Sequence, residues 1–205
     1  PHSAGQARAR RAAEPRRAEA HAAYALALAA LGRVALAETE ARAALALDAG
    51  LPRAHRARAE ILRRGGDFEG AAGELRVAIG KGPGDVDDRL ALVTVLAARG
   101  LWDEAERELA GVVLAAPRRA EARFLVAYVA LARERLPEAV AAAGEALAFR
   151  RRYPEARLVR AEALARQGRL EEARRDLEQF LAEAPPDLSG ERARAEAFLR
   201  RPASR

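Results

Sequence analysis

The chain has 205 residues, half of them apolar and only 4 % aromatic, and it carries a formal net charge of +6. Its abundant alanine, leucine, arginine and glutamate favour helices, so an all-α protein is expected. The absence of cysteine excludes disulfides and thiolate metal sites.

We expect neither a signal peptide nor a membrane span within the given residues. Residues 1–17 lack the apolar stretch of a signal peptide, and the most apolar run, residues 22–31, is shorter than the roughly 20 residues of a membrane span. We therefore expect a soluble protein. The arginine and alanine bias is typical of a GC-rich bacterial genome and leaves cytoplasm, periplasm and envelope open as compartments. Because the sequence begins at Pro1 without methionine, we expect a processed form or a piece of a longer chain.

The basic excess is concentrated at the two ends. Residues 1–17 carry five arginines and one glutamate, and residues 189–205 carry five arginines and two glutamates. The middle of the chain is close to neutral, with arginine and glutamate interleaved as on solvated helix faces. One hypothesis is therefore a binder of nucleic acid or of an anionic membrane surface through arginine-rich termini, with binding that weakens as salt rises.

A repeat with a period of 34 residues runs along the chain. Glycines stand at positions 32, 66, 100 and 168, and Glu134 occupies the remaining place in the series. Five residues after each of these positions comes an alanine, namely Ala37, Ala71, Ala105, Ala139 and Ala173. Seven residues further on stand Ala44, Ala78, Val112, Ala146 and Phe180. Glycine suits the turn after a first helix, and small alanines let the paired helices approach closely.

Stretches such as "RGLWDEAERELAGVVLAAP" and "QGRLEEARRDLEQFLAEAP" show this pattern, which resembles the tetratricopeptide repeat family over residues 18–187. The resemblance implies an all-α, right-handed α–α superhelix, a solenoid of helix pairs. Its five repeats would be 18–51, 52–85, 86–119, 120–153 and 154–187.

The expected helices follow from the repeat, in chain order. They pair as 18–31 with 35–48, 52–64 with 68–81, 86–98 with 102–115, 120–132 with 136–149, and 154–166 with 170–183. A final helix at 188–200, carrying Phe198 and Leu199, suits a cap on the end of the solenoid. We expect residues 1–17 to be disordered and residues 201–205 to be frayed.

Individual positions within the repeat carry further expectations. Trp102, the only tryptophan, starts a second helix and is interpreted as a packing residue at the turn, with stacking on a ligand as the alternative. Glu134 in place of glycine predicts altered geometry in the fourth repeat. Equivalent basic residues in the first helices are expected to cover the helix pair with their stems while their heads reach water, namely His21, His55, Arg89, Arg123 and Arg157.

Signatures of catalysis are absent from the sequence. Its three serines lie near the ends, no histidines stand at metal-ligand spacing, and the carboxylates belong to alternating Glu/Arg helix faces. We therefore expect no enzyme, no catalytic residue, no metal, no cofactor and no small-molecule substrate.

A protein-binding groove is the leading hypothesis. The resemblance implies a concave face lined mainly by the first helices, and repeat position places an apolar strip there, made of Leu90, Phe124, Tyr128, Leu131 and Leu158. Thr94 faces the same way, and a basic patch beside the strip comprises Arg53, Arg56, Arg63 and Arg64. Apolar grooves with flanking charge receive extended peptides or amphipathic helices.

The alternatives at this face stay open. The strip's side chains could pack on one another or be covered by the C-terminal helix, and the arginines could be a solvated face. The leading interpretation is a non-enzymatic scaffold or adaptor for a peptide or helix segment; a self-assembling homo-oligomer is a further alternative, and nucleic acid is the less favoured partner. Family members that clamp chaperone tails use paired asparagines, and this chain has no asparagine.

Overall fold

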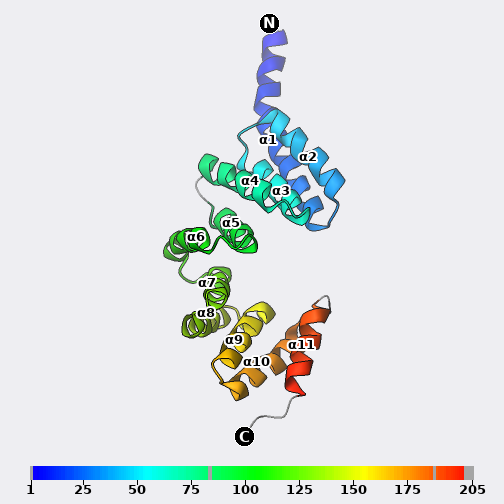
Figure 1. The fold of residues 1–205 in the computed structure, drawn as a ribbon. Helices are drawn as coiled ribbons and strands as arrows, with labels where there is room; N and C mark the ends of the chain where they lie inside the picture. The colour runs from blue at the N-terminus through cyan, green and yellow to red at the C-terminus, as the bar shows by residue number, and fades with distance from the viewer. Residues whose placement is uncertain (1, 83–84, 187, 201–205) are drawn as a thin grey trace. The chain divides into compact units, whose positions relative to one another are not determined.

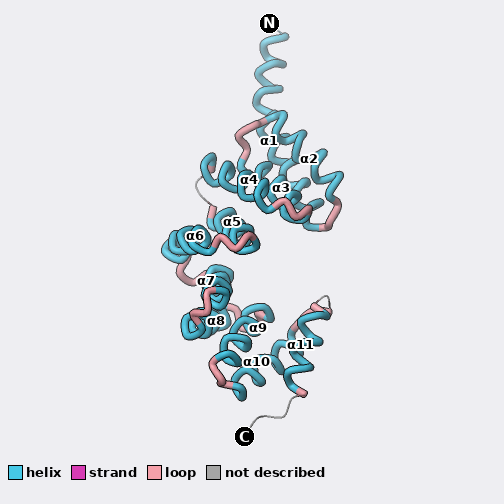
Figure 2. Tube along the Cα trace, in the orientation of Figure 1, coloured by secondary structure: helices cyan, strands magenta, loops and turns pink. Residues whose placement is uncertain are grey.

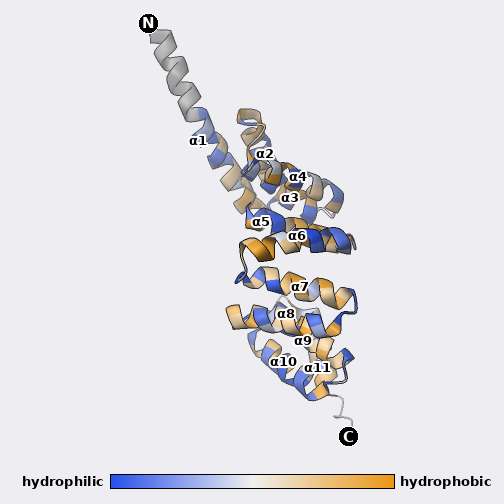
Figure 3. Ribbon diagram, turned by 90° about the vertical axis from the view of Figure 1, so that its left-hand side faces the viewer, coloured by the Kyte–Doolittle hydropathy of each residue, from blue (hydrophilic) through white to orange (hydrophobic). Residues whose placement is uncertain are grey.

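The protein is all-α, as the sequence predicts. In a computed structural model, the described residues, which are 2–82, 85–186 and 188–200, form eleven helices and no strand (Figure 1 and Figure 2). Side chains are described from Glu14 onward within these ranges. Hydrophobic and hydrophilic residues are mixed along the helices, as helices with one buried face require (Figure 3). None of the described helices combines the length and the apolar character needed to cross a bilayer.

The chain divides into two compact units, Pro1–Leu101 and Trp102–Arg205. The first contains α1 (His2–Ala30), α2 (Val34–Leu47), α3 (Pro52–Arg64), α4 (Phe68–Lys81) and α5 (Val86–Ala98). The second contains α6 (Trp102–Ala115), α7 (Ala120–Ala132), α8 (Leu136–Phe149), α9 (Pro154–Arg166), α10 (Leu170–Glu183) and α11 (Ser189–Leu199).

Neighbouring helices pack as pairs within each unit. In the first unit, α1 packs on α2, α3 packs on α4, and the two pairs meet through α1 and α3. In the second unit, α7 with α8 and α9 with α10 form the corresponding pairs, and α7 also contacts α9. The first helices of successive pairs are therefore neighbours, which gives each unit a surface built from first helices.

The helix bounds follow the 34-residue register closely. The bounds of α3 to α10 are those expected, and α2 and α11 differ from expectation by one residue at each end. The first helix is different, because α1 begins at His2 rather than at residue 18. The disorder expected for residues 1–17 is therefore wrong for the backbone, since this alanine- and arginine-rich stretch favours a helix even with Pro15 inside it. The expected frayed tail, 201–205, lies outside the described residues.

Each first helix ends in the same turn. Gly32, Gly66, Gly100 and Gly168 have φ values between 72° and 81°, a left-handed conformation that glycine adopts without a Cβ clash. At Gly32 the amide donates to Ala29 O, and the next amide donates to Leu28 O, the pair of bonds of a Schellman motif.

Glu134 makes this turn without glycine. Its φ is 58°, its amide donates to Leu131 O, and the amide of Arg135 donates to Ala130 O. The altered geometry expected for the fourth repeat is therefore wrong at this turn, since Glu134 adopts the left-handed conformation itself. A side chain there costs about 1–2 kcal/mol.

The small residues of the repeat lie where paired helices meet. All five alanines that follow the turns are fully buried, namely Ala37, Ala71, Ala105, Ala139 and Ala173. The second position of the pattern is equally buried in every repeat, with Phe180 the largest residue there. Phe180 belongs to a core cluster against which Phe198 and Leu199 of α11 pack, so the last helix covers the side of α10.

Replacing Glu134 by glycine should relieve the strain of the left-handed turn. We expect Glu134→Gly to be more stable than Glu134→Ala by about 1 kcal/mol, because alanine keeps the Cβ in the left-handed conformation and glycine does not. Both variants lose the exposed pair between Glu134 and Arg166, so their comparison isolates the backbone. Urea unfolding measures the difference; equal stability of the two variants would contradict this account of the turn.

Candidate functional site

A cavity of about 370 Å³ opens on the first-helix surface of the first unit. Its walls are mostly aliphatic, and most of its lining residues come from α1, α3 and α5. Leu26, Glu60 and Thr94 stand at the same position of three successive repeats. We call this the first-helix pocket; it is lined by Leu26, Ala30, Arg56, Ala59, Glu60, Arg63, Leu75, Ala91, Thr94 and Val95.

One edge of the first-helix pocket is held by an ion pair between α3 and α5. Arg56 donates through Nε to Asp88 and through Nη2 to Asp85 Oδ2 at 2.6 Å. Asp88 is only 3 % exposed, so its carboxylate depends on this partner for compensation. The hydrogen bond to Asp88 is the largest influence on Arg56 and raises the pKa of its guanidinium.

The other edge is a group of one carboxylate and two guanidiniums on α3. Arg63 binds Glu60 through two hydrogen bonds of 2.8 Å, and Arg64 Nε donates to Glu60 Oε1 at 2.6 Å. Burial favours the neutral acid, but the bonds from Arg63 and Arg64 outweigh it and hold the pKa of Glu60 below its ordinary value of 4.5. Glu60 is therefore ionised at neutral pH.

These pairs change the interpretation of the basic patch. Arg53 also has a carboxylate partner, Glu19 on α1, at 3.0 Å. Each of the four arginines of the predicted basic patch is ion-paired, so carboxylates compensate part of the positive charge of the patch. Glu19 and Arg53 occupy the same position in successive repeats, which is a sequence signal for their contact.

In the second unit, four aromatic rings lie next to one another. The Phe124 ring centroid is 6.3 Å from that of Tyr128 and 5.1 Å from that of Tyr153. Trp102 lies 6.4 Å from Tyr128, measured between ring centroids. Tyr128 is 41 % exposed and is the most exposed of the four aromatic residues.

The predicted apolar strip is narrower than expected. Leu90 and Leu131 are buried, because both turn toward the packed interior of their units. Leu131 joins the core cluster of α7, α8 and α9, and half-buried Leu158 packs against the cluster around Phe180.

The structure brings some of the predicted site residues together. Phe124 and Tyr128 are close together, and Thr94 lies in the first-helix pocket with Arg56 and Arg63. Leu90 belongs to a different unit from the other strip residues.

The equivalent histidine and arginine side chains of the first helices also have carboxylate partners. Nδ1 of His21 lies 2.6 Å from Glu40, and Nδ1 of His55 lies 2.6 Å from Glu74, in both cases across the helix pair. Arg157 similarly binds Glu183 of α10 at 2.9 Å. These basic side chains brace first helix to second helix instead of only reaching water. Glu40 and Glu74 stand 34 residues apart, so the histidine brace recurs in the first two repeats.

No group of three histidine, cysteine, aspartate or glutamate side chains is placed to hold a metal ion in the described part of the chain. The charged residues of the first-helix pocket, Arg56, Glu60 and Arg63, are engaged in ion pairs.

Comparison of the sequence with models of known protein families identifies the family of the chain. Two profiles of the tetratricopeptide repeat family match, over residues 62–127 and 141–189. No curated protein matches the sequence.

Solved structures with a similar fold include pilF of Pseudomonas aeruginosa, with 18 % identity, a TM-score of 0.77 and coverage of 90 % of both chains. TTC0263, a TPR protein of Thermus thermophilus, has 24 % identity and a TM-score of 0.74, with 89 % of this chain and 98 % of that one covered. YrrB, described as a TPR protein with an unusual peptide-binding site, has 19 % identity and a TM-score of 0.62, over 85 % of this chain and 90 % of that one. At these identities the likeness shows the fold.

Breaking the buried pair at the first-helix pocket should destabilise the first unit. We expect Arg56→Met to lower the free energy of unfolding by about 2–3 kcal/mol, because Asp88 is left buried without its guanidinium. Arg53→Met is the matched control; its pair with Glu19 is half exposed and should be worth less than about 1 kcal/mol. Chemical denaturation of both variants measures the difference, and equal losses would contradict the role of Asp88.

Acid should weaken the edge formed by Glu60. The pKa of Glu60 is lower in the folded protein than its ordinary value of 4.5. Its contribution to the free energy of unfolding is therefore present above pH 4.5 and is lost as the pH falls through the pKa of the folded protein. We expect Glu60→Gln to lose less stability than the wild type between about pH 6 and about pH 3. Urea midpoints across this range measure it; parallel curves for the two proteins would show that Glu60 does not contribute.

Proposed function

Because the chain belongs to the tetratricopeptide repeat family, whose members are in general non-catalytic scaffolds for protein interaction, we propose that it is an adaptor that binds a peptide or helix of a partner protein. The contact surfaces would be those built from first helices, with the five repeats extending over residues 18–187. The first-helix pocket is the observation that carries the proposal.

The first-helix pocket has the dimensions and walls of an anchor site. A cavity of about 370 Å³ lined by aliphatic side chains accommodates a bulky apolar side chain of a bound segment. Burying one such side chain is worth about 1.5–3 kcal/mol, enough to make it the centre of the binding energy. An extended peptide or an amphipathic helix both present anchors of this kind.

The rim of the pocket is ordered before any partner arrives. Arg56 is held by Asp85 and Asp88, and Arg63 is held by Glu60 in a two-bond contact. Side chains already fixed by ion pairs lose little conformational entropy on binding. The Thr94 hydroxyl donates to Leu90 O at 2.9 Å, which leaves its oxygen able to accept a hydrogen bond from a partner.

Tyr128 supports a second contact surface in the second unit. Its ring is flanked by Trp102 and Phe124, while the residue as a whole is 41 % exposed. Tyrosines of this kind combine a large apolar contact area with a hydrogen-bonding tip, and they are frequent at protein interfaces. A TPR protein of similar fold, YrrB, is described as having a peptide-binding site, which supports peptides as ligands of this architecture.

Filling the first-helix pocket should abolish binding. A peptide selected from a random library against the full chain is expected to bind Thr94→Trp at least about tenfold more weakly, because the indole occupies the anchor's place. Fluorescence anisotropy of the labelled peptide gives the dissociation constants.

Thr39→Trp is the matched control for this experiment. Thr39 and Thr94 are the chain's only threonines, both are exposed, and both donate to the carbonyl four residues earlier. Thr39 lies on α2, outside the pocket, so its variant should bind normally. Equal binding to wild type and Thr94→Trp, or the failure of the library to yield any binder, would contradict the proposal.

A further inference from the structure

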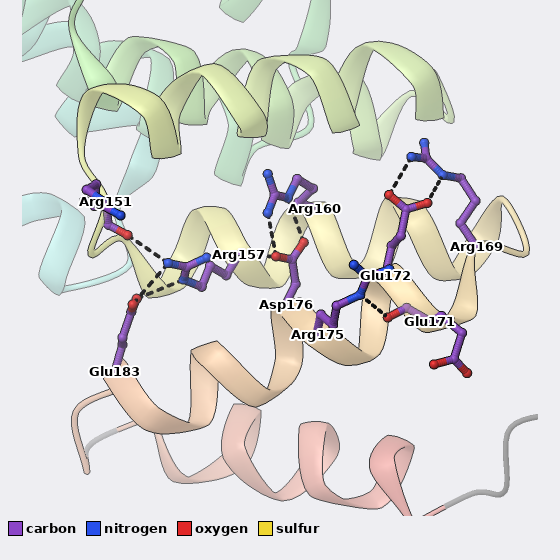
Figure 4. A network of polar contacts seen from close by, with 9 residues as sticks. All are labelled: Arg151, Arg157, Arg160, Arg169, Glu171, Glu172, Arg175, Asp176 and Glu183. Atoms are coloured by element: carbon purple, nitrogen blue, oxygen red, sulfur yellow. Dashed lines mark hydrogen bonds and ion pairs between the residues drawn. The ribbon is translucent and has the colours of Figure 1, made fainter.

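A second cavity lies in the second unit, between α8, α9 and α10, and it is polar where the first-helix pocket is apolar. Its volume is about 380 Å³. Figure 4 shows its arginines and carboxylates on α9, on α10 and in the turn between the two helices. We call it the arginine cavity; it is lined by Val140, Arg160, Leu164, Arg169, Glu172, Arg175, Asp176 and Gln179.

Two of the three arginines are fixed by carboxylates. Arg160 binds Asp176 through hydrogen bonds of 2.7 and 2.6 Å, and Asp176 is almost fully buried. Arg169 binds Glu172 in the same two-bond manner, at 2.7 and 2.8 Å. The hydrogen bond from Arg169 holds the pKa of Glu172 below its ordinary value, so this carboxylate is ionised at neutral pH.

The third guanidinium has no carboxylate bound to it within the described part of the chain. Arg175 Nε donates to the backbone oxygen of Glu171 at 3.3 Å, a long bond to a neutral group (Figure 4). Three guanidiniums therefore face two carboxylates in the lining. The arginine cavity carries one positive charge in excess.

The cavity one repeat earlier has a different charged lining. An equivalent cavity lies between α6, α7 and α8, and there Glu106 pairs with Arg135 across successive repeats. Thirty-four residues later, Val140 stands in the place of Glu106 and Arg169 in the place of Arg135. Arg160 and Arg175 stand in the places of Val126 and Ala141. The preceding cavity is lined by two arginines and two carboxylates, and the later cavity by three arginines and two carboxylates, so the later one has one more positive charge.

We propose that the arginine cavity binds a carboxylate group on a short aliphatic body. One carboxylate neutralises the single excess charge, and its two oxygens match the planar fork of a guanidinium. A dianionic phosphate would instead leave an excess negative charge beside Glu172 and Asp176. Half-buried Val140 provides aliphatic surface for the body of the ligand.

The test is a titration of the full chain with pentanoate, followed through the arginine Nε–H signals in nitrogen-15 NMR. Saturable shifts are expected at Arg175 and Arg169. Pentanamide, which has the same body without charge, should give none, and inorganic phosphate should bind more weakly than pentanoate. A capped glutamate, N-acetyl-glutamate N-methylamide, distinguishes two possible carriers of the bound carboxylate. If it binds more tightly than pentanoate, the natural ligand is a glutamate side chain of a protein; if it binds more weakly, the natural ligand is a free carboxylic acid.

Variants assign the binding to the cavity. Arg175→Gln should weaken pentanoate binding about tenfold, the value of a charge-assisted hydrogen bond. Arg152→Gln, an exposed arginine of the loop before α9, is the control and should leave binding unchanged. Val140→Glu restores the carboxylate that Glu106 provides in the preceding repeat, and should abolish binding by occupying the arginines.

Several outcomes would overturn the proposal. These are the absence of saturable shifts, equal shifts with pentanamide, tighter binding of phosphate, or an equal loss in Arg152→Gln and Arg175→Gln. Circular dichroism checks that Val140→Glu stays helical; if it does not, Arg175→Gln decides alone. The outcome is independent of peptide binding at the first-helix pocket, which lies on other helices.

Discussion

The fold depends on a close contact between paired helices at a single small residue. In each repeat an alanine five residues after the turn is fully buried between the first and second helix, and a larger side chain there would force the pair apart. The left-handed residue before it sets the direction in which the second helix leaves. Once each pair has this geometry, first helices lie against first helices within a unit, and a surface for recognition results.

Ion pairs then determine what this surface offers to a partner. The chain is rich in arginine, yet Arg53, Arg56 and Arg63 are each bound to a carboxylate, and His21 and His55 brace their helix pairs through glutamates. Charge on the first-helix surface of the first unit is therefore used for rigidity rather than for attraction. The contact proposed for a partner is therefore the aliphatic first-helix pocket, while the lining of the arginine cavity in the second unit has one more guanidinium than carboxylates.

The sequence predicts the helices well and the site only in part, for a physical reason. A repeat in a fixed register specifies where each turn and each buried alanine falls, so the bounds of α3 to α10 could be predicted to the residue. Repeat position also identifies the face on which Thr94, Arg56 and Tyr128 lie. Repeat position does not predict how deeply Leu90 and Leu131 are buried, nor that Asp88 is the ion-pair partner of Arg56. Both depend on side-chain packing between successive helices. The start of α1 differs from expectation because net charge suggests disorder where alanine content favours a helix.

The central claim is that recognition takes place on surfaces made of first helices. The most direct test maps amide and methyl chemical shifts of the full chain while a library-selected peptide is added. The account predicts that the largest changes fall on α1, α3 and α5 around Leu26, Thr94 and Val95, with smaller changes on α2 and α4. Changes confined to α2 and α4, with the residues of the first-helix pocket unmoved, would contradict it.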